Sequence, residues 1–228
     1  MVTAPDPLIR PPLQRRSQES LERVLQAGAE LLREAGYEGF TLQEVSRRSG
    51  VSVGSIYART ASKESLILAI YERETARMAE ENRRIEETSH REDLYGRSLV
   101  EALVTDMAQG VLNNAATLRV FMHRAVVDQE FWERGSQGLR ALARTFEGAL
   151  HEHREEIQHP DPELAIDIAF RFVYDALARR VSHGAGFESD RDVPEDVLVR
   201  ELARAAADYL IGPEKPRARK ARAKKRKG

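Results

Sequence analysis

The sequence contains no cysteine, which excludes disulfide bonds, thiol catalysis and zinc sites built on cysteine. It has no apolar run near the roughly 20 residues that a membrane-spanning helix needs. Its N-terminus lacks the charged-then-apolar order of a secretory signal. It also offers no convincing strand alternation and no glycine-rich phosphate loop. We therefore expect an all-α, cytoplasmic protein without a membrane segment, and we assign it no cofactor.

Charge is divided strongly along the chain, although the net charge is only −1. Residues 1–70 hold 9 basic and 8 acidic side chains, residues 71–214 hold 18 and 29, and residues 215–228 hold 9 and none. The acidic middle would repel a nucleic acid, so contact with phosphate has to be concentrated on the near-neutral head and on the basic tail. The tail is interpreted as a solubility segment, as an arm on neighbouring phosphates, or as a cover for the acidic body.

A helix-turn-helix is predicted from Thr41 onward. Thr41 can cap a first helix and Glu44 can reach back to its amide, which together form a capping box. Gly50 stands where a left-handed residue ends that helix, and Ser52 caps the next one. Ser62 caps a third helix. In this motif the second helix enters the major groove of DNA, so the pattern favours a DNA-binding protein.

The residue types at the start of the second helix suit that role. Gly54 lets the backbone approach a duplex closely, and Ser55 can donate to a phosphate or to a base. Lys63 lies in the first turn of the third helix, where an ammonium group and free backbone amides can converge on one phosphate oxygen. These positions are the candidate DNA contacts.

Two other patterns are rejected as chemical sites. Gly50-Val51-Ser52-Val53-Gly54 matches the G-x-S-x-G elbow of hydrolases, but that elbow needs a buried strand before the serine, and the preceding residues favour a helix. His151 and His153 are two residues apart, so on a helix they point to different sides and fail metal-ligand spacing. We assign no catalytic residue and no metal site, and we expect no enzyme.

Helical periodicity continues through the rest of the chain. The expected helices cover about 17–35, 63–87, 94–112, 118–127, 130–157, 163–182 and 195–211. The helix 163–182 is apolar on most of its circumference, and the last helix also has more apolar surface than one neighbour needs. A central core helix in a monomer is one interpretation. A twofold homodimer through these last two helices is the other, and it suits the reading of paired half-sites.

Candidate effector contacts are the large and polar side chains on the middle helices. They are Met107, Phe121, Arg124, Trp132, Phe146, Phe170 and Tyr174. Plain core packing is the alternative for each, because apolar stripes at helical spacing occur in any bundle. Arg124, beside His123 on an apolar helix, indicates recognition of a carboxylate or phosphate, but Asp128 four residues later can supply that partner without a ligand.

The segment of about residues 17–72 resembles the DNA-binding head of TetR (tetracycline-repressor-like) transcription regulators. The resemblance rests on Ala27-Gly28-Ala29-Glu30-Leu31-Leu32-Arg33-Glu34-Ala35-Gly36-Tyr37, on Thr41-Leu42-Gln43-Glu44-Val45-Ser46, on Gly50-Val51-Ser52-Val53-Gly54-Ser55-Ile56-Tyr57 and on Ser62-Lys63-Glu64-Ser65-Leu66. It implies that Thr41, Tyr57 and Lys63 contact phosphate. It also implies that the recognition helix places four residues at or near bases, namely Ser52, Val53, Gly54 and Ser55.

One position departs from the family pattern. Thr60 stands where such regulators usually show an aromatic residue, three positions after the tyrosine. A threonine there would leave that site in the core underfilled.

The expected organisation is a disordered arm at 1–14, a helix-turn-helix domain at 15–65, a ligand-binding and dimerisation domain at 66–212 and a disordered basic tail at 213–228. The resemblance implies a homodimeric repressor that is cytoplasmic and nucleoid-associated. It would bind a double-stranded palindromic operator and be released by a small-molecule effector of unknown identity. Two alternatives remain: an architectural or partner-controlled DNA-binding protein with no small-molecule response, and a helical enzyme or binding module with a vestigial head.

Overall fold

The computed structural model describes residues 15–187 and 189–213, so the predictions for the arm 1–14 and for the tail after residue 213 lie outside the described residues. Within that part of the chain every regular element is helical, as predicted. The helices are α1 (Arg15–Gly39), α2 (Leu42–Ser49), α3 (Val53–Tyr57), α4 (Lys63–Glu81), α5 (Arg83–Ser89), α6 (Gly96–Asn113), α7 (Ala115–Ala125), α8 (Gln129–His151), the 3₁₀ turn η1 (Arg154–Glu156), α9 (Pro162–His183) and α10 (Glu195–Ile211).

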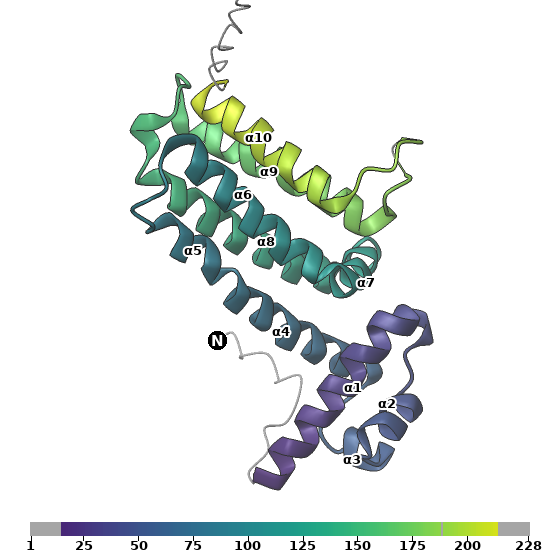
Figure 1. Ribbon diagram of the computed structural model, residues 1–228. Helices are drawn as coiled ribbons and strands as arrows, with labels where there is room; N and C mark the ends of the chain where they lie inside the picture. The colour runs from purple at the N-terminus through teal and green to yellow at the C-terminus, as the bar shows by residue number, and fades with distance from the viewer. Residues whose placement is uncertain (1–14, 188, 214–228) are drawn as a thin grey trace, which may run out of the picture.

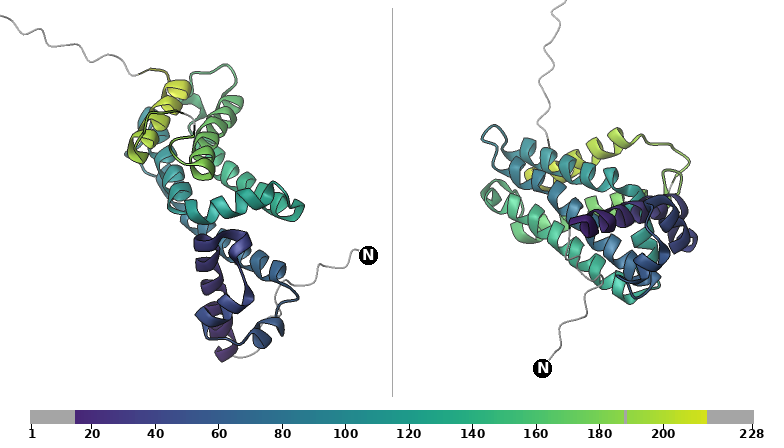
Figure 2. Two further views of the ribbon diagram at one scale, coloured as in Figure 1. Left: turned by 90° about the vertical axis from the view of Figure 1, so that its right-hand side faces the viewer. Right: turned by 90° about the horizontal axis from the view of Figure 1, so that it is seen from below.

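The helices form two lobes joined by α4. Figure 1 shows a small head built from α1, α2 and α3 at one end, and a larger body built from α5 to α10 at the other. The view at right angles in Figure 2 shows the same two lobes. Helix α7 packs against α1 at the junction, while α9 and α10 lie side by side on the part of the body away from the head. None of the described helices is long and apolar enough to cross a membrane.

The head is stabilised by close packing of α1 on α4. One glycine interrupts α1, and another allows the two helices to approach each other. Gly36 has φ 68° and ψ −173°, a conformation that interrupts α1 where the sequence predicted its end. At Gly28 the two helices approach so closely that an added Cβ would lie 2.4 Å from Cδ1 of Ile70. Phe40, fully buried, closes the core of the head beside this contact.

The body has its own core, in which α6, α8, α9 and α10 bury one face each. Its fully buried members include Leu103, Met107, Phe146 and Val173. The head core in turn extends through α4 as far as Tyr71 and takes in Phe121 of α7 and Phe131 of α8. Helix α4 therefore belongs to the head core at its start and connects that core to the body.

Two predicted helices are shorter than the sequence indicated. The single helix expected from Lys63 to Glu87 is broken at Asn82, and the break allows Ile85 of α5 to turn into the body core, where it is 1% exposed. The helix expected over 130–157 ends at His151. Beyond η1 the backbone amide of Gln158 donates to the carbonyl of Leu210 at 2.7 Å, which fastens the turn to α10.

Candidate DNA-binding site and effector region

Helix α2 begins and ends as its sequence predicts. The Thr41 hydroxyl accepts from the backbone amide of Glu44 at 3.2 Å, and Gly50 ends the helix with φ 68° and ψ 18°. Half of the expected capping box is wrong, because the Glu44 carboxylate turns to Arg47 and Arg48 at 2.6 to 2.8 Å rather than to the Thr41 amide. Those hydrogen bonds, from Arg47 first and from Arg48 second, lower the pKa of Glu44 to about 2.

Helix α3 presents its early residues to solvent. Ser52 caps it by accepting from the amide of Ser55 at 3.2 Å, while Ile56 is 2% exposed and anchors the helix in the head. Gly54 lies in open space, since an added Cβ would meet nothing within 4 Å. Tyr57 is 55% exposed, which is unusual for a large aromatic side chain that only packs. The helix is therefore held from one side and is free on the other.

The start of α4 carries both a cation and an anion. Ser62 caps the helix, and the Lys63 ammonium donates to the carbonyl of Tyr37 at 3.1 Å and lies 4.9 Å from the centroid of its ring. The pKa of the Glu64 carboxyl is lowered, first by a hydrogen bond from its own backbone amide and then by the Ser62 hydroxyl. Glu64 was missed by sequence reasoning, although a carboxylate in the first turn of a helix is the expected competitor of an anion there.

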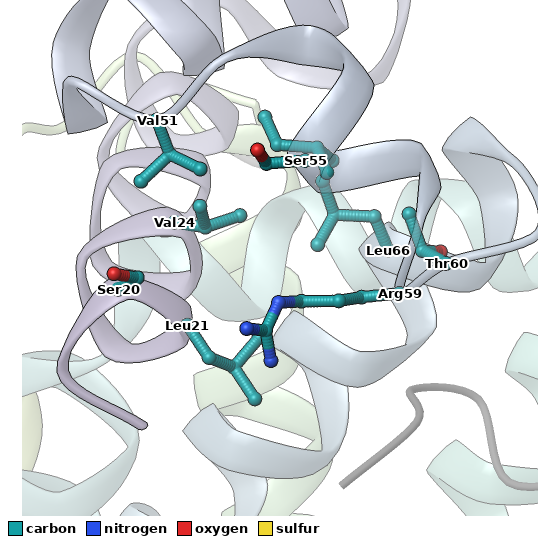
Figure 3. A pocket seen from close by; sticks show the side chains of 9 residues that line it. Ser20, Leu21, Val24, Val51, Ser55, Arg59, Thr60 and Leu66 are labelled. Carbon is teal, nitrogen blue, oxygen red and sulfur yellow. The ribbon is translucent and has the colours of Figure 1, made fainter. Parts of the chain in front are cut away.

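Thr60 and the space beside it agree with the expected underfilling. The Thr60 side chain is buried, and its hydroxyl donates to the carbonyl of Ser62 at 3.0 Å. A cavity of about 10 Å³ lies next to it, between α1 and α3, as Figure 3 shows. Leu21 and Val24 of α1 form one wall, and Ile56 forms another.

The seven predicted effector residues are not brought together. Met107, Phe146, Phe170 and Tyr174 belong to the body core or pack against it, and burial raises the pKa of the Tyr174 hydroxyl to about 12. Phe121 lies in a separate aromatic group, with its ring centroid 4.6 Å from that of Tyr71 and 6.2 Å from that of Phe131. This second group lies where α4, α7 and α8 meet, at the junction of head and body.

Arg124 and Trp132 lie at the turn between α7 and α8. Trp132 is 51% exposed and lines a surface depression of about 410 Å³ together with Asp128. Arg124 donates to Asp128 at 2.7 Å, the partner that the sequence offered, and its guanidinium lies 4.0 Å from the ring centroid of Tyr37. Tyr37 was not among the predicted site residues, because a contact between segments 87 residues apart has no local signal.

Comparison with known proteins agrees with this geometry. Residues 24–70 match the family model of bacterial regulatory proteins of the tetR family. No curated protein sequence matches the chain. Solved structures do, although at identities that show the fold alone.

Three of these structures illustrate the likeness. A TetR transcription regulator from Haloarcula marismortui is 18% identical with a TM-score of 0.64, covering 85% of this chain and 99% of that chain. A transcriptional regulator of the TerR/AcrR family from Aquifex aeolicus is 22% identical with a TM-score of 0.59, covering 82% and 96%. The transcriptional regulator FadR from Bacillus subtilis, solved in complex with stearoyl-CoA, is 17% identical with a TM-score of 0.60, covering 85% and 99%.

The fold is all-helical with an N-terminal helix-turn-helix, and the solved structures share it. The match over residues 24–70 shows that this segment, which runs from α1 into α4, is similar to bacterial regulatory proteins of the tetR family.

Proposed function

We propose that the protein is a homodimeric, cytoplasmic repressor whose two heads bind a palindromic operator and which a small-molecule effector releases. The accessible start of α3 carries the DNA part of this proposal. Gly54 leaves room for a base edge, Ser55 offers a hydroxyl, and Tyr57 projects into solvent at the end of the helix. Thr41, Tyr57 and Lys63 would contact phosphate, while Ser52, Val53, Gly54 and Ser55 would lie at or near bases.

The uncovered side of α9 and α10 supports the dimer. Leu164 is 49% exposed, Ile168 39% and Tyr209 37%, so a second row of apolar side chains lies outside the body core. A twofold contact through these two helices would cover that surface and would pair two heads. Within each protomer the proposed domains are 15–65 for DNA and 66–212 for ligand and dimer, with α4 shared between them.

The junction of head and body supports the effector response. The aromatic group of Tyr71, Phe121 and Phe131 joins α4 to α7 and α8. An apolar molecule that separates these rings would shift α4, including its first turn in the helix-turn-helix head. The fold is shared with FadR, which was solved with an acyl-CoA, and this favours a large and mostly apolar effector. Effector binding would bias a dimer between groove-matched and separated heads.

Selection of a bound sequence from random duplex DNA tests the proposal, repeated with the intergenic DNA beside the protein's own gene. We expect one palindrome with half-site centres about one helical turn apart, roughly 34 Å. Tyr57→Ala and Lys63→Ala should each weaken binding to all sequences. Lys63→Ala should also reduce the salt slope by about 2, one neutralised phosphate per head, whereas Tyr57→Ala removes a neutral donor and should leave the slope unchanged. Tyr95→Ala, on a tyrosine that is 71% exposed in the body, is the matched control and should bind as the wild type does.

Two outcomes would contradict the proposal. If the wild-type chain shows no preference between selected and random duplex at moderate ionic strength, the protein does not bind a specific operator. If Tyr95→Ala loses affinity as strongly as Tyr57→Ala, the proposal that the DNA contacts lie in the head is wrong.

A further inference from the structure

The contact between α1 and the recognition helix α3 is incompletely filled. The cavity between them has about 10 Å³, close to the volume needed for one water molecule, and its walls are mostly apolar. Thr60 is too short to fill it, and its hydroxyl is already used by the Ser62 carbonyl. Apolar packing alone therefore leaves the angle of α3 against α1 poorly determined.

Arg59 spans this incomplete contact. It lies two residues after the end of α3, and its amide donates to the carbonyl of Ile56 at 3.0 Å, which continues the helical turn. Figure 3 shows its side chain extended along the cavity toward α1, with the guanidinium beside Leu21. At its end the guanidinium donates to the hydroxyl of Ser17 in the first turns of α1. In the part of the chain that the structure describes, no carboxylate forms an ion pair with Arg59.

A second guanidinium fastens the other half of the motif in the same way. Arg23 of α1 donates to the backbone carbonyl of Ser49, the last residue of α2, at 3.2 Å. Arg23 thus connects α1 to the end of α2, and Arg59 connects the segment after α3 to the start of α1.

We propose that Arg59 is a positioning residue for DNA recognition, which acts through Ser17. The methylene stem of Arg59 covers the space beside Thr60, and the hydrogen bond to Ser17 fixes the direction in which α3 leaves the head. This role rests on the proposed function, because a fixed α3 matters only if its start meets base edges. This positioning role differs from a direct contact with phosphate. In a direct contact the Arg59 guanidinium would point to the duplex, and Ser17 would not affect DNA binding.

A double-mutant cycle on the full chain separates these two roles. The variants are Arg59→Ala, Ser17→Ala and the pair, each titrated with the selected palindromic duplex by fluorescence anisotropy at four salt concentrations. Each single change should weaken operator binding about tenfold, since a roughly threefold loss per head is multiplied over two heads. The pair should be no weaker than Arg59→Ala alone, because both changes remove the same contact. The slope of affinity against salt should equal that of the wild type.

Arg59→Lys supplies the conservative variant, because it keeps the stem and a donor for Ser17. It should recover most of the affinity lost in Arg59→Ala. Thermal unfolding of every variant shows that the protein is folded at the temperature of the titration. Binding to random duplex should change less than binding to the operator, since a tilted α3 harms base contacts more than backbone contacts.

Several results would overturn the proposal. If Ser17→Ala binds as the wild type does while Arg59→Ala lowers the salt slope by about 2, Arg59 contacts phosphate directly. If the two single losses add, Arg59 does not act through Ser17. If the wild-type chain selects no sequence at all, the proposed function is overturned and this role with it. If the wild type selects a palindrome and the variants bind it with unchanged affinity, the role of Arg59 is overturned and the proposed function is not.

Discussion

The guanidinium of Arg124 on α7 lies 4.0 Å from the ring centroid of Tyr37, and the carbonyl of Tyr37 accepts a hydrogen bond from the Lys63 ammonium at 3.1 Å. Tyr37 therefore connects Arg124 in the body to Lys63, which is proposed to contact phosphate in the head. Arg124 is in turn held by Asp128, whose carboxylate also caps α8. Movement of the turn between α7 and α8 is expected to reach the start of α4 by this route.

Arg124→Ala tests the connection. Loss of the stacked guanidinium should cost the protein about 1 to 2 kcal/mol of stability, because a partly buried cation over a ring contributes that much. Operator affinity should fall several-fold, since Lys63 loses the support of an ordered Tyr37. Arg140→Ala, an exposed arginine on α8, is the control. Chemical denaturation and anisotropy titration measure the two effects, and wild-type operator affinity in Arg124→Ala would disprove the connection.

A buried carboxylate holds α1 to α4 farther along the same junction. Glu74 has a side chain only 3% exposed and lies within ion-pair distance of Arg33 at 3.5 Å, of Arg77 at 3.3 Å and of Arg73. Arg77 also donates to Asn114 at 2.6 Å, at the junction of α6 and α7. The carboxylate therefore neutralises arginines from the head and from the connecting helix at one point.

Glu74→Ala should be strongly destabilising, by about 3 kcal/mol, because it leaves these arginines without their common partner. Glu80→Ala is the matched control on the same helix, since Glu80 forms an exposed pair with Arg83 and should cost less than about 1 kcal/mol. Urea denaturation of both variants measures the difference. Equal midpoints for the two would show that burial of Glu74 has no energetic consequence.

The local signals of the sequence account for the head better than for the body. Thr41, Gly50, Ser52 and Ser62 act through neighbours within four residues, so their caps and the bounds of α2 and α3 were predicted. The underfilling beside Thr60 was expected from the family resemblance, in which an aromatic residue usually stands at that position. The partners of Arg124 and Arg59 across the fold were not predicted. A contact of that kind depends on how helices distant in sequence are packed, which periodicity alone does not specify.

The same reason explains the errors. Periodicity favoured one helix from Lys63 to Glu87, but Asn82 breaks it because Ile85 has to reach a core formed by later helices. The predicted effector residues were chosen as large or polar side chains on the middle helices, and the structure divides them between the body core, the aromatic junction and the surface beside Trp132. Their role as effector contacts stays a prediction.

Glu44 provides a test by pH. Its pKa in the folded protein is about 2, lowered by Arg47 and Arg48 from 4.5, so the stabilising contribution is fully present above pH 4.5 and is lost as the pH falls toward 2. Arg48→Ala should raise the Glu44 pKa toward 4.5, and Arg15→Ala, which removes an exposed pair elsewhere on the head, should not. Carboxyl NMR titration measures both midpoints. A Glu44 midpoint near 4.5 in the wild type would contradict the bidentate contact.

Gly28 tests how closely α1 and α4 are packed. An added Cβ would lie 2.4 Å from Cδ1 of Ile70, which is fully buried, and 3.4 Å from Phe40, so the Ile70 side chain would have to move within a filled core. Gly28→Ala should therefore destabilise the protein by about 1 to 2 kcal/mol, even though alanine is the better helix former by about 1 kcal/mol.

A control and a rescue separate the two effects at Gly28. Gly148→Ala on α8, where an added Cβ meets nothing within 4 Å, should stabilise the protein by about 0.5 to 1 kcal/mol through helix propensity alone. Ile70→Val removes the Cδ1 that would clash, so in that background Gly28→Ala should be neutral or stabilising, which is a non-additive result for neighbouring residues. Thermal and urea unfolding of the four variants measure it. If the cost of Gly28→Ala is the same with isoleucine and with valine at position 70, the clash is not its cause.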